Sequence, residues 1–383
     1  KMTMIGITGT NGKTTSTYLL KHILEQTLGA KVGLVGTIQN LIGDEALPTE
    51  RTTPESYELQ GLFAQMAAAG CTHAVMEVSS HALTLDRVAG VHFAVGLFTN
   101  LTEDHLDFHK DMEDYCDAKA KLFRMCDTGC VNADDPWMPR LVQNAACRLM
   151  TYSARADADL VAQNIALHSD GVSFEARSHG ERAQIHLSIP GSFTVYNALG
   201  VIQTAQALGL PLPQIAEALS TAQGVKGRAE VVPTPGKAYT VLIDYSHTPD
   251  SLENILKTVR GFCQGKIFAV FGCGGDRDPF KRPVMGEIAS RLADVAIVTS
   301  DNPRTEDPNE IIRQIVAGMG AAQTPPTVIE NRPKAIEWAM DHAQPGDVIV
   351  LCGKGHETYQ EIGHEKIHLD EREVVAAYLE RMP

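Results

Sequence analysis

A glycine-rich turn between an apolar run and an amphipathic run constrains the fold of this chain most strongly. Residues 2–8 predict a buried strand, the turn at residues 9–12 follows, and a helix is predicted from Lys13 onward. In this order the N–H groups of the turn and of the helix N-terminus converge on one point, where they bind anionic oxygen. The segment therefore predicts a nucleotide site made of Gly9, Thr10, Asn11, Gly12, Lys13, Thr14 and Thr15.

Within this site we expect Lys13 to reach the outer phosphates of ATP and the hydroxyl of Thr14 to bind Mg²⁺. The spacing departs from the commonest phosphate-binding loop, because five residues separate Gly6 from Gly12 and only two separate Gly9 from Gly12. An ordinary glycine-rich turn between a strand and a helix is the alternative interpretation.

Length, charge and cysteine usage limit the classes of protein that fit. At 383 residues the chain is longer than a single core normally reaches, so we expect two domains. The formal net charge of −14 argues against a nucleic-acid partner and against binding to an anionic membrane, and the longest apolar runs have only strand length. The eight cysteines contain no Cys-x-x-Cys pair, and no signal peptide precedes the first strand, so a cytoplasmic protein without a zinc site is expected.

Strand-length apolar runs alternate with amphipathic runs through the first half of the chain. Strands are predicted at residues 2–8, 32–36, 73–78 and 91–99, and helices at residues 14–28, 54–69, 112–123, 194–208 and 213–222. Between the helices at 112–123 and 194–208, the alternation of polar and apolar residues over 158–190 instead predicts antiparallel hairpins.

The alternation of strands and helices restarts near Arg228, with strands predicted at residues 241–245, 267–272, 295–299 and 348–351. We therefore predict an α/β protein with a domain boundary between residues 228 and 229. The first domain, 1–228, is expected to be of the P-loop ATPase type, with a mostly parallel sheet and a small antiparallel β region. The second, 229–383, is expected to be Rossmann-like, with helices on both faces of a parallel sheet.

Polar residues follow two predicted strands of the first half. Glu77 ends the strand at 73–78, and the loop at 99–107 contains His105. Carboxyl ends of parallel strands are where open α/β sheets bind ligands, and a carboxylate there suits Mg²⁺. A helix-capping loop with solvated acids is the alternative for residues 99–107, and the helical periodicity around Lys119 predicts an ordinary solvated lysine.

Loops after the predicted strands of the second half carry charges of both signs. Asp244 is placed to accept ribose hydroxyls and His247 to face phosphate, while the turn at 272–278 contains Arg277. The loops at 301–304 and 353–357 complete the set, and we expect all of them along one edge of the second sheet. This mixture suits a zwitterionic ligand, with structural salt bridges as the alternative for any one loop.

These motifs, taken in order along the chain, closely resemble the Mur ligase family. The residues that carry the resemblance are the loop at 8–14, the segment at 100–107, Asp244 with His247, and Asp301-Asn302-Pro303-Arg304. The resemblance covers the whole chain, and it is strongest to members that add meso-diaminopimelate to UDP-N-acetylmuramoyl-L-alanyl-D-glutamate. It implies ATP-driven amide synthesis with Mg²⁺: the D-glutamyl carboxylate attacks the γ-phosphate, and the amine displaces phosphate from the resulting acyl phosphate.

The resemblance also implies roles for individual residues. It assigns catalysis to Lys13, Glu77, His105 and Lys119, with Lys119 carbamylated by CO₂, and it assigns metal binding to Thr14, Glu77, His105 and Lys119. ATP contacts are implied for Asn197, Arg228, Asp244 and His247 in addition to the loop. The muramyl dipeptide is expected to contact Thr52, Thr53, Ser79 and Arg87. Diaminopimelate is expected to contact Arg277, Asp301, Asn302, Pro303, Arg304, Gly353 and Glu357.

Three positions depart from the family pattern: Arg51 and Leu85 replace amides that contact the substrate in some members, and Thr194 replaces a frequent Asn beside the adenine. Family members normally begin with a uridine-binding domain, so we expect this chain to be the central and C-terminal domains of a larger protein, and a poor ligase as it stands. Small-molecule substrates and a monomeric state are expected. A lysine-adding relative, a folylpolyglutamate-synthetase-like ligase and a nucleotide switch that ligates nothing are the alternatives.

Overall fold

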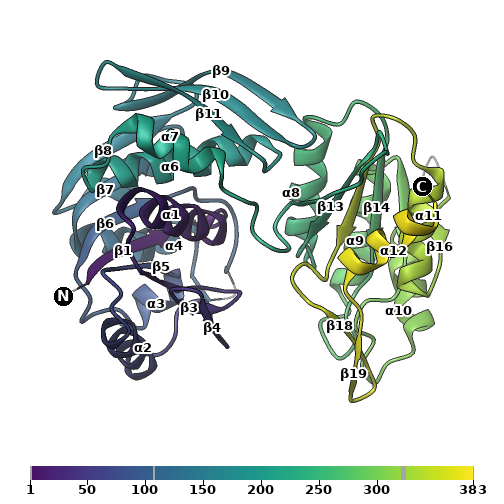
Figure 1. The fold of residues 1–383 in the computed structure, drawn as a ribbon. Helices are drawn as coiled ribbons and strands as arrows, with labels where there is room; N and C mark the ends of the chain where they lie inside the picture. The colour runs from purple at the N-terminus through teal and green to yellow at the C-terminus, as the bar shows by residue number, and fades with distance from the viewer. Residues whose placement is uncertain (1, 107, 321–324, 383) are drawn as a thin grey trace. The chain divides into compact units, whose positions relative to one another are not determined.

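A computed structural model describes residues 2–106, 108–320 and 325–382, and it divides the chain into two compact units (Figure 1). The first unit comprises residues up to 166, 172–187 and 193–223, and the second comprises 167–171, 188–192 and the residues from 224 onward. The boundary that the sequence places between 228 and 229 stays a prediction. Within the described residues, no helix combines the length and the apolar character needed to cross a membrane.

The first unit is built on a mostly parallel sheet with the strand order β11-β10-β9-β8-β7-β6-β1-β5-β2-β3-β4. Its elements are β1 (Thr3–Thr8), α1 (Lys13–Leu28), β2 (Val32–Val35), β3 (Asn40–Ile42), β4 (Glu45–Leu47), α2 (Ser56–Ala68), β5 (His73–Glu77), α3 (Ser80–Thr84), β6 (Phe93–Phe98), α4 (Met112–Ala120), η1 (Lys121–Arg124), β7 (Cys126–Asn132), α5 (Met138–Val142), β8 (Arg148–Ser153), β9 (Leu160–His168), β10 (Gly171–Ser178), β11 (Glu181–Leu187), α6 (Ser192–Ala207) and α7 (Leu212–Ser220).

Strand β1 occupies the middle of this sheet, where it pairs in parallel with β5 on one side and with β6 on the other. Ile5 and Ile7 of this strand are fully buried, as expected for a central parallel strand, whose sequence is typically apolar throughout. Strand β2 extends the parallel arrangement beyond β5. The carboxyl ends of all four strands therefore lie along one edge, where the loops that follow them meet.

The antiparallel hairpins predicted over residues 158–190 are confirmed, with β10 and β11 paired antiparallel. Strands β7 and β8 were not predicted, because their sequences contain glycine, aspartate and arginine rather than an apolar run. They are strands because each pairs in parallel with a neighbour, β7 with β6 and β8 with β7. The helix predicted to continue to residue 123 instead ends at Ala120, and a 3₁₀ turn follows.

The second unit contains a sheet with the order β12-β13-β17-β14-β15-β16 and a separate hairpin, β18-β19 (Figure 1). Its elements are β12 (Glu230–Val232), β13 (Thr240–Asp244), α8 (Pro249–Arg260), β14 (Ile267–Phe271), α9 (Lys281–Leu292), β15 (Val295–Val298), α10 (Pro308–Ala317), β16 (Thr327–Val328), α11 (Arg332–His342), β17 (Val348–Cys352), β18 (Tyr359–Ile362), β19 (Glu365–His368) and α12 (Glu371–Arg381). The sheet was predicted to be parallel, and it is so except at β12, which pairs antiparallel with β13.

Strand β17 lies between β13 and β14, and both pairings are parallel. The strand order thus reverses at β17, and an α/β sheet binds its ligands at such a switch point. The segments that follow β13, β14, β15 and β17 begin at this edge, as the sequence predicted. They hold the charged residues described below.

Candidate functional site

Two glycines allow the loop after β1 to approach its neighbours closely. Gly9 has φ +147° and Gly12 has φ +85°, backbone conformations that L side chains rarely adopt. A Cβ at Gly9 would lie 1.9 Å from Oγ1 of Thr99, and a Cβ at Gly12 would lie 2.2 Å from Oδ1 of Asn197. Glycine is therefore required at both positions by conformation and by space.

The loop after β6 holds the glycine-rich loop in place. The Thr10 N–H donates to the carbonyl of Asn100 at 2.8 Å, and the Asn11 N–H donates to Oδ1 of Asn100 at 3.0 Å. The Thr99 hydroxyl donates to the carbonyl of Asn11 at 2.7 Å. These contacts place the polar loop of residues 99–107 beside the nucleotide loop, although Asp107 itself lies outside the described residues.

Two lysines donate hydrogen bonds to backbone carbonyls of the glycine-rich loop. Nζ of Lys13 donates to the carbonyls of Gly9 and Thr10, at 2.8 and 2.9 Å. Nζ of Lys119, which is 1% exposed, donates to the same Gly9 carbonyl at 3.0 Å. Burial, and then the positive charge of Lys13, hold the pKa of Lys119 well below its usual value. The prediction of a solvated Lys119 from helical periodicity is wrong.

Tyr115, which was not predicted as a site residue, links Lys119 to the nucleotide loop. Nζ of Lys119 lies 4.4 Å from the centroid of the Tyr115 ring, whose hydroxyl is 3.1 Å from Oγ1 of Thr10. The ring centroid of His105 lies 6.0 Å from that of Tyr115, so the predicted catalytic residues His105 and Lys119 flank the same ring. Burial raises the pKa of Tyr115 to about 12, which keeps the phenol protonated.

The carboxylate of Glu77 is buried at the end of β5 and is bound by hydroxyl and amide donors. Its Oε1 accepts from Oγ1 of Thr14 at 2.9 Å and from the Thr37 N–H at 3.0 Å, and its Oε2 accepts from Oγ1 of Thr37 at 2.9 Å. The predicted metal ligands Thr14 and Glu77 therefore lie together. Thr37 follows β2 and was not predicted, because a single threonine gives no sequence signal.

This donor set fits Mg²⁺. Hydroxyl and carboxylate oxygens are ligands that Mg²⁺ accepts, and the ion commonly takes its remaining ligands from water and from substrate phosphates. Among the described residues, no group of three or more His, Cys, Asp or Glu side chains could hold a metal ion. A metal at Thr14 and Glu77 would therefore need further ligands besides these side chains, such as water and substrate phosphate oxygens.

The four residues expected to contact the muramyl dipeptide form one network beside Glu77. Oγ1 of Thr53 donates to the Glu77 carbonyl at 2.8 Å and accepts from the Ser79 N–H at 3.1 Å, while Nη1 of Arg87 donates to the Thr53 carbonyl at 3.2 Å. Oγ1 of Thr52 lies 3.0 Å from Oγ1 of Thr37, which is bound to Glu77. The structure thus gathers these four residues around Glu77, the residue predicted to bind the metal.

The three departures from the family pattern lie in different surroundings. Arg51 pairs with Glu55, the N-cap residue of helix α2, and Leu85 is 52% exposed. Thr194 is fully buried on α6, the helix that also carries Asn197.

A cavity of about 250 Å³ lies beside the glycine-rich loop within the first unit. Its lining includes Asn11, Gly12, Asn132, Tyr196 and Asn197. Asn197 is 3% exposed, and its Nδ2 has no hydrogen-bond partner among the described residues. A buried amide donor without a partner is costly, so this atom is suited to a ligand that offers an acceptor, such as a purine nitrogen.

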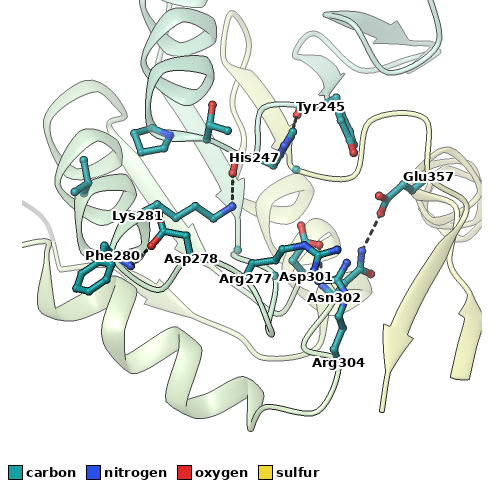
Figure 2. Close-up of a pocket in the computed structure, with 16 residues that line it drawn as sticks. Tyr245, His247, Arg277, Asp278, Phe280, Lys281, Asp301, Asn302, Arg304 and Glu357 are labelled. Carbon is teal, nitrogen blue, oxygen red and sulfur yellow. Dashed lines mark hydrogen bonds between the residues drawn. The ribbon is translucent and has the colours of Figure 1, made fainter. Parts of the chain in front are cut away.

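The second unit has a larger cavity, of about 670 Å³, at the switch point of its sheet (Figure 2). Of the residues predicted to contact diaminopimelate, those that line it are Arg277, Asp301, Asn302, Arg304, Gly353 and Glu357. Pro303 does not line the cavity, but its carbonyl packs so closely on Gly275 that a Cβ there would lie 1.9 Å away. His247 also lines the cavity, at the end near Lys281, whose Nζ donates to the His247 carbonyl at 2.8 Å.

A buried lysine fixes the orientation of Asn302 in the cavity wall. Nζ of Lys354, which is 0% exposed, donates to Oδ1 of Asn302 at 2.8 Å and to Oε2 of Glu357 at 3.2 Å. Nδ2 of Asn302 donates to the same Oε2 at 3.0 Å (Figure 2). Lys354 was not predicted, because a lysine between two glycines is typical of an exposed loop.

Arg304 is already paired with other groups of the second unit. Its Nε donates to Oε2 of Glu361 at 2.9 Å, its Nη1 donates to the Gly275 carbonyl at 2.8 Å, and the side chain is 20% exposed. A lysine in the cavity would therefore not leave Arg304 as a buried unpaired charge.

Asp301 is a buried carboxylate between two cations. Burial acts to raise its pKa, but Lys354 at 3.9 Å and Arg332 at 4.0 Å outweigh burial, and the net pKa is lowered. The Asn302 N–H also donates to its Oδ1 at 2.7 Å. Asp301 is therefore ionised and holds the start of the loop that carries Arg304.

The second-unit residues predicted to contact ATP lie near one another. Oδ2 of Asp244 accepts from the Ala229 N–H at 2.8 Å, and burial raises the pKa of Asp244 despite the nearby charge of Arg228. The guanidinium of Arg228 lies 5.5 Å from the ring centroid of Tyr245, and the ring of His247 lies 4.5 Å from it. Their role in ATP binding stays a prediction.

A glycine-rich loop between a strand and a helix in one α/β unit, and a charged cavity at the switch point of the other, are features of ATP-dependent enzymes that act on small molecules. Residues 7–205 match the Mur ligase middle domain, and residues 227–355 match the Mur ligase glutamate ligase domain. The chain belongs to the Mur ligase family.

Named relatives match along nearly the whole chain. A protein of Clostridium acetobutylicum named UDP-N-acetylmuramoyl-L-alanyl-D-glutamate--2,6-diaminopimelate ligase 1 is 48% identical over 383 residues, which is 100% of this chain and 79% of that protein. A ligase with the same name, without the final number, from Caldanaerobacter subterraneus subsp. tengcongensis is 50% identical over 380 residues, 99% of this chain and 78% of that one. A solved structure described as UDP-N-acetylmuramoyl-L-alanyl-D-glutamate--2,6-diaminopimelate ligase has a TM-score of 0.74 and 33% identity, and the match covers 100% of this chain and 79% of that one.

Gly12→Ala is expected to weaken ADP binding at least about tenfold, because the new methyl group meets Asn197 and the backbone must keep φ +85°. Isothermal titration with ADP and Mg²⁺ measures this. Gly61→Ala on α2 is the matched control, since its Cβ meets no atom within 4 Å. Equal ADP affinity in Gly12→Ala and the unmutated chain would contradict the proposed placement of the nucleotide.

Asp301→Asn is expected to lower the free energy of unfolding at pH 7 by about 3–5 kcal/mol, because Lys354 and Arg332 lose a buried counter-charge. The pKa of Asp301 is lower in the folded state, so its contribution is present above about pH 4 and is lost as the pH falls through the lowered pKa. Urea unfolding at pH 7 and pH 3.5 measures the free energy of unfolding of both proteins, and the difference between Asp301→Asn and the unmutated chain should be smaller at pH 3.5. Exposed Glu380→Gln is the control. A difference in the free energy of unfolding that does not change with pH would contradict a stabilising, ionised Asp301.

Proposed function

We propose that this chain is an ATP-dependent ligase that joins meso-diaminopimelate to the D-glutamate of UDP-N-acetylmuramoyl-L-alanyl-D-glutamate in peptidoglycan synthesis. The observation that carries the proposal is the cavity of the second unit, where Arg304 lines the same wall as the Asn302–Glu357 pair. The distal carbon of diaminopimelate carries one carboxylate and one ammonium. The guanidinium suits the carboxylate, and the Glu357 carboxylate suits the ammonium.

The nucleotide loop would hold ATP with its backbone N–H groups, Lys13 and the N-terminus of α1. Lys13 is bound to carbonyls of its own loop, so it must exchange those contacts for phosphate oxygens when ATP enters. Thr14 and Glu77 would hold Mg²⁺, which would withdraw charge from the phosphate oxygens. Asn197 would contact the adenine through its unpartnered Nδ2.

Thr52, Thr53, Ser79 and Arg87 would orient the muramyl dipeptide so that its D-glutamyl carboxylate faces the γ-phosphate. Attack of that carboxylate gives an acyl phosphate, and the amine of diaminopimelate then displaces phosphate to form the amide. Positioning of this kind is the main contribution that a protein makes to phosphoryl transfer. Arg228, Asp244 and His247 are proposed to bind the nucleotide, and the enzyme is proposed to act in the cytoplasm as a monomer.

Lys119 is proposed to be carbamylated and, with His105, to support a second metal ion. Only a neutral amine attacks CO₂, and the lowered pKa of Lys119 supplies the neutral amine. Carbamylation would convert the buried neutral amine into an anion, which would attract the positive charge of Lys13. The modified side chain would then present oxygen ligands, which an unmodified lysine does not have.

Labelled bicarbonate is expected to give a carbamate carbon signal in the unmutated protein and none in Lys119→Ala. The fraction carbamylated should rise with pH as the amine loses its proton, and a short carboxylic acid in solution should restore part of the activity of Lys119→Ala. Lys121→Ala is the matched control, because Lys121 donates to the Leu83 carbonyl rather than to the nucleotide loop. A carbamate signal that survives Lys119→Ala would contradict the assignment.

Steady-state ligation by the intact protein is expected to favour meso-diaminopimelate over lysine by about 10- to 100-fold in kcat/KM. The basis is the loss of hydrogen bonds between charged groups, about 1.5–3 kcal/mol, since Arg304 keeps Glu361 as a partner when lysine is bound. Arg304→Ala should remove most of this preference and leave the KM for ATP unchanged. Equal kcat/KM for the two amino acids in the unmutated protein would instead support a lysine-adding enzyme.

A further inference from the structure

The hairpin β18-β19 is joined to the loop that carries Arg304 rather than to either large sheet. All residues of β19 are exposed, so the hairpin has little core of its own. A two-stranded hairpin alone is marginally stable in water, and this one must depend on its attachments. One attachment is made by Gln360, whose Nε2 donates to the Asp301 carbonyl at 2.6 Å.

The hairpin holds the backbone of Arg304 on both sides. The Arg304 N–H donates to the Glu361 carbonyl at 3.1 Å, and the Gly363 N–H donates to the Arg304 carbonyl at 2.7 Å. Arg304 and Ile362 also form a parallel β-bridge. Arg304 has φ +50°, a conformation that is uncommon for a residue other than glycine and that persists only where the surroundings impose it.

Glu361 makes two further contacts between the hairpin and residues that line the cavity. Its carboxylate accepts from Nε of Arg304 at 2.9 Å, and its N–H donates to Oδ1 of Asn302 at 2.9 Å. Glu361 does not itself line the cavity, whereas Arg304 and Asn302 both do. Its contacts with the cavity wall are therefore made through these two residues.

The contacts of the Arg304 guanidinium leave part of it available. Glu361 occupies the Nε–H, and the Gly275 carbonyl occupies one N–H of Nη1. The remaining N–H groups of the two terminal nitrogens are the ones that can bind a carboxylate as a fork. A guanidinium held in this way loses less conformational freedom when it binds a carboxylate.

We infer that Glu361 is a positioning residue for the amino-acid substrate: its carboxylate fixes the Arg304 fork, and thereby sets the preference for a substrate with a distal carboxylate. This inference rests on the proposed function. It assigns specificity to a hairpin whose residues do not line the cavity. Neutralisation of Arg304 by Glu361 is the competing effect, and it predicts the opposite change in affinity when Glu361 is removed.

Steady-state ligation by the intact protein tests the inference, with meso-diaminopimelate and lysine as the varied substrates. Glu361→Ala is expected to raise the KM for meso-diaminopimelate roughly 10- to 100-fold, which corresponds to one lost charged hydrogen bond, and to leave the KM for lysine and for ATP within about twofold. Glu361→Gln keeps an acceptor for Nε and should show a smaller rise. Glu365→Gln, an exposed change on the partner strand, is the control for altered charge on the hairpin.

A double-mutant cycle separates positioning from a loss of stability. If Glu361 acts through Arg304, Glu361→Ala should change the KM for meso-diaminopimelate less than about twofold when Arg304→Ala is already present. Additive effects, an unchanged KM or a lower KM in Glu361→Ala would each overturn the inference. An unmutated protein that does not prefer meso-diaminopimelate over lysine would refute the proposed function instead, and that outcome is read from the unmutated protein alone.

Discussion

The alignment of parallel strands is the constraint on which both candidate sites depend. In the first unit β1, β2, β5 and β6 run in the same direction, so Glu77 and the glycine-rich loop meet at one edge of the sheet. In the second unit β13, β14, β15 and β17 are also parallel, so the loops that line the larger cavity begin at one edge of that sheet. Because the backbone hydrogen bonds of each sheet fix these ends, substitutions in the loops can change the chemistry without changing the fold.

Buried charge is handled differently at the two sites. Around the nucleotide loop, Lys13 and Lys119 share the carbonyl of Gly9, and the resulting repulsion and burial favour a neutral Lys119. Around the amino-acid cavity, buried Lys354 lies among carboxylates. The two lysines at the glycine-rich loop are suited to binding anionic groups such as phosphates. The ion pairs of Lys354 are suited to fixing the conformation of the cavity side chains before a zwitterion binds.

The sequence was sufficient to predict the α/β fold class, the antiparallel hairpins and the sheet edges at which the polar loops begin, because these depend on local apolar patterns and on strand direction. It was not sufficient for Tyr115, Thr37, Lys354 or Glu361, whose partners lie far away in the sequence. The burial of Lys119 against Gly9 depends on a contact across 110 positions, which helical periodicity does not contain. The pairing of Arg304 with Glu361 likewise required the hairpin, which carries no apolar signal.

Ligation by the intact protein with oxygen-18 in the D-glutamyl carboxylate distinguishes the acyl-phosphate route from other routes to the amide. Attack of that carboxylate on the γ-phosphate followed by displacement by the amine moves one carboxylate oxygen to phosphate for each amide formed. We expect labelled phosphate in a one-to-one ratio with the meso-diaminopimelate adduct. Unlabelled phosphate released together with the same amide would contradict the acyl-phosphate mechanism, and phosphate released without any amide would contradict ligation.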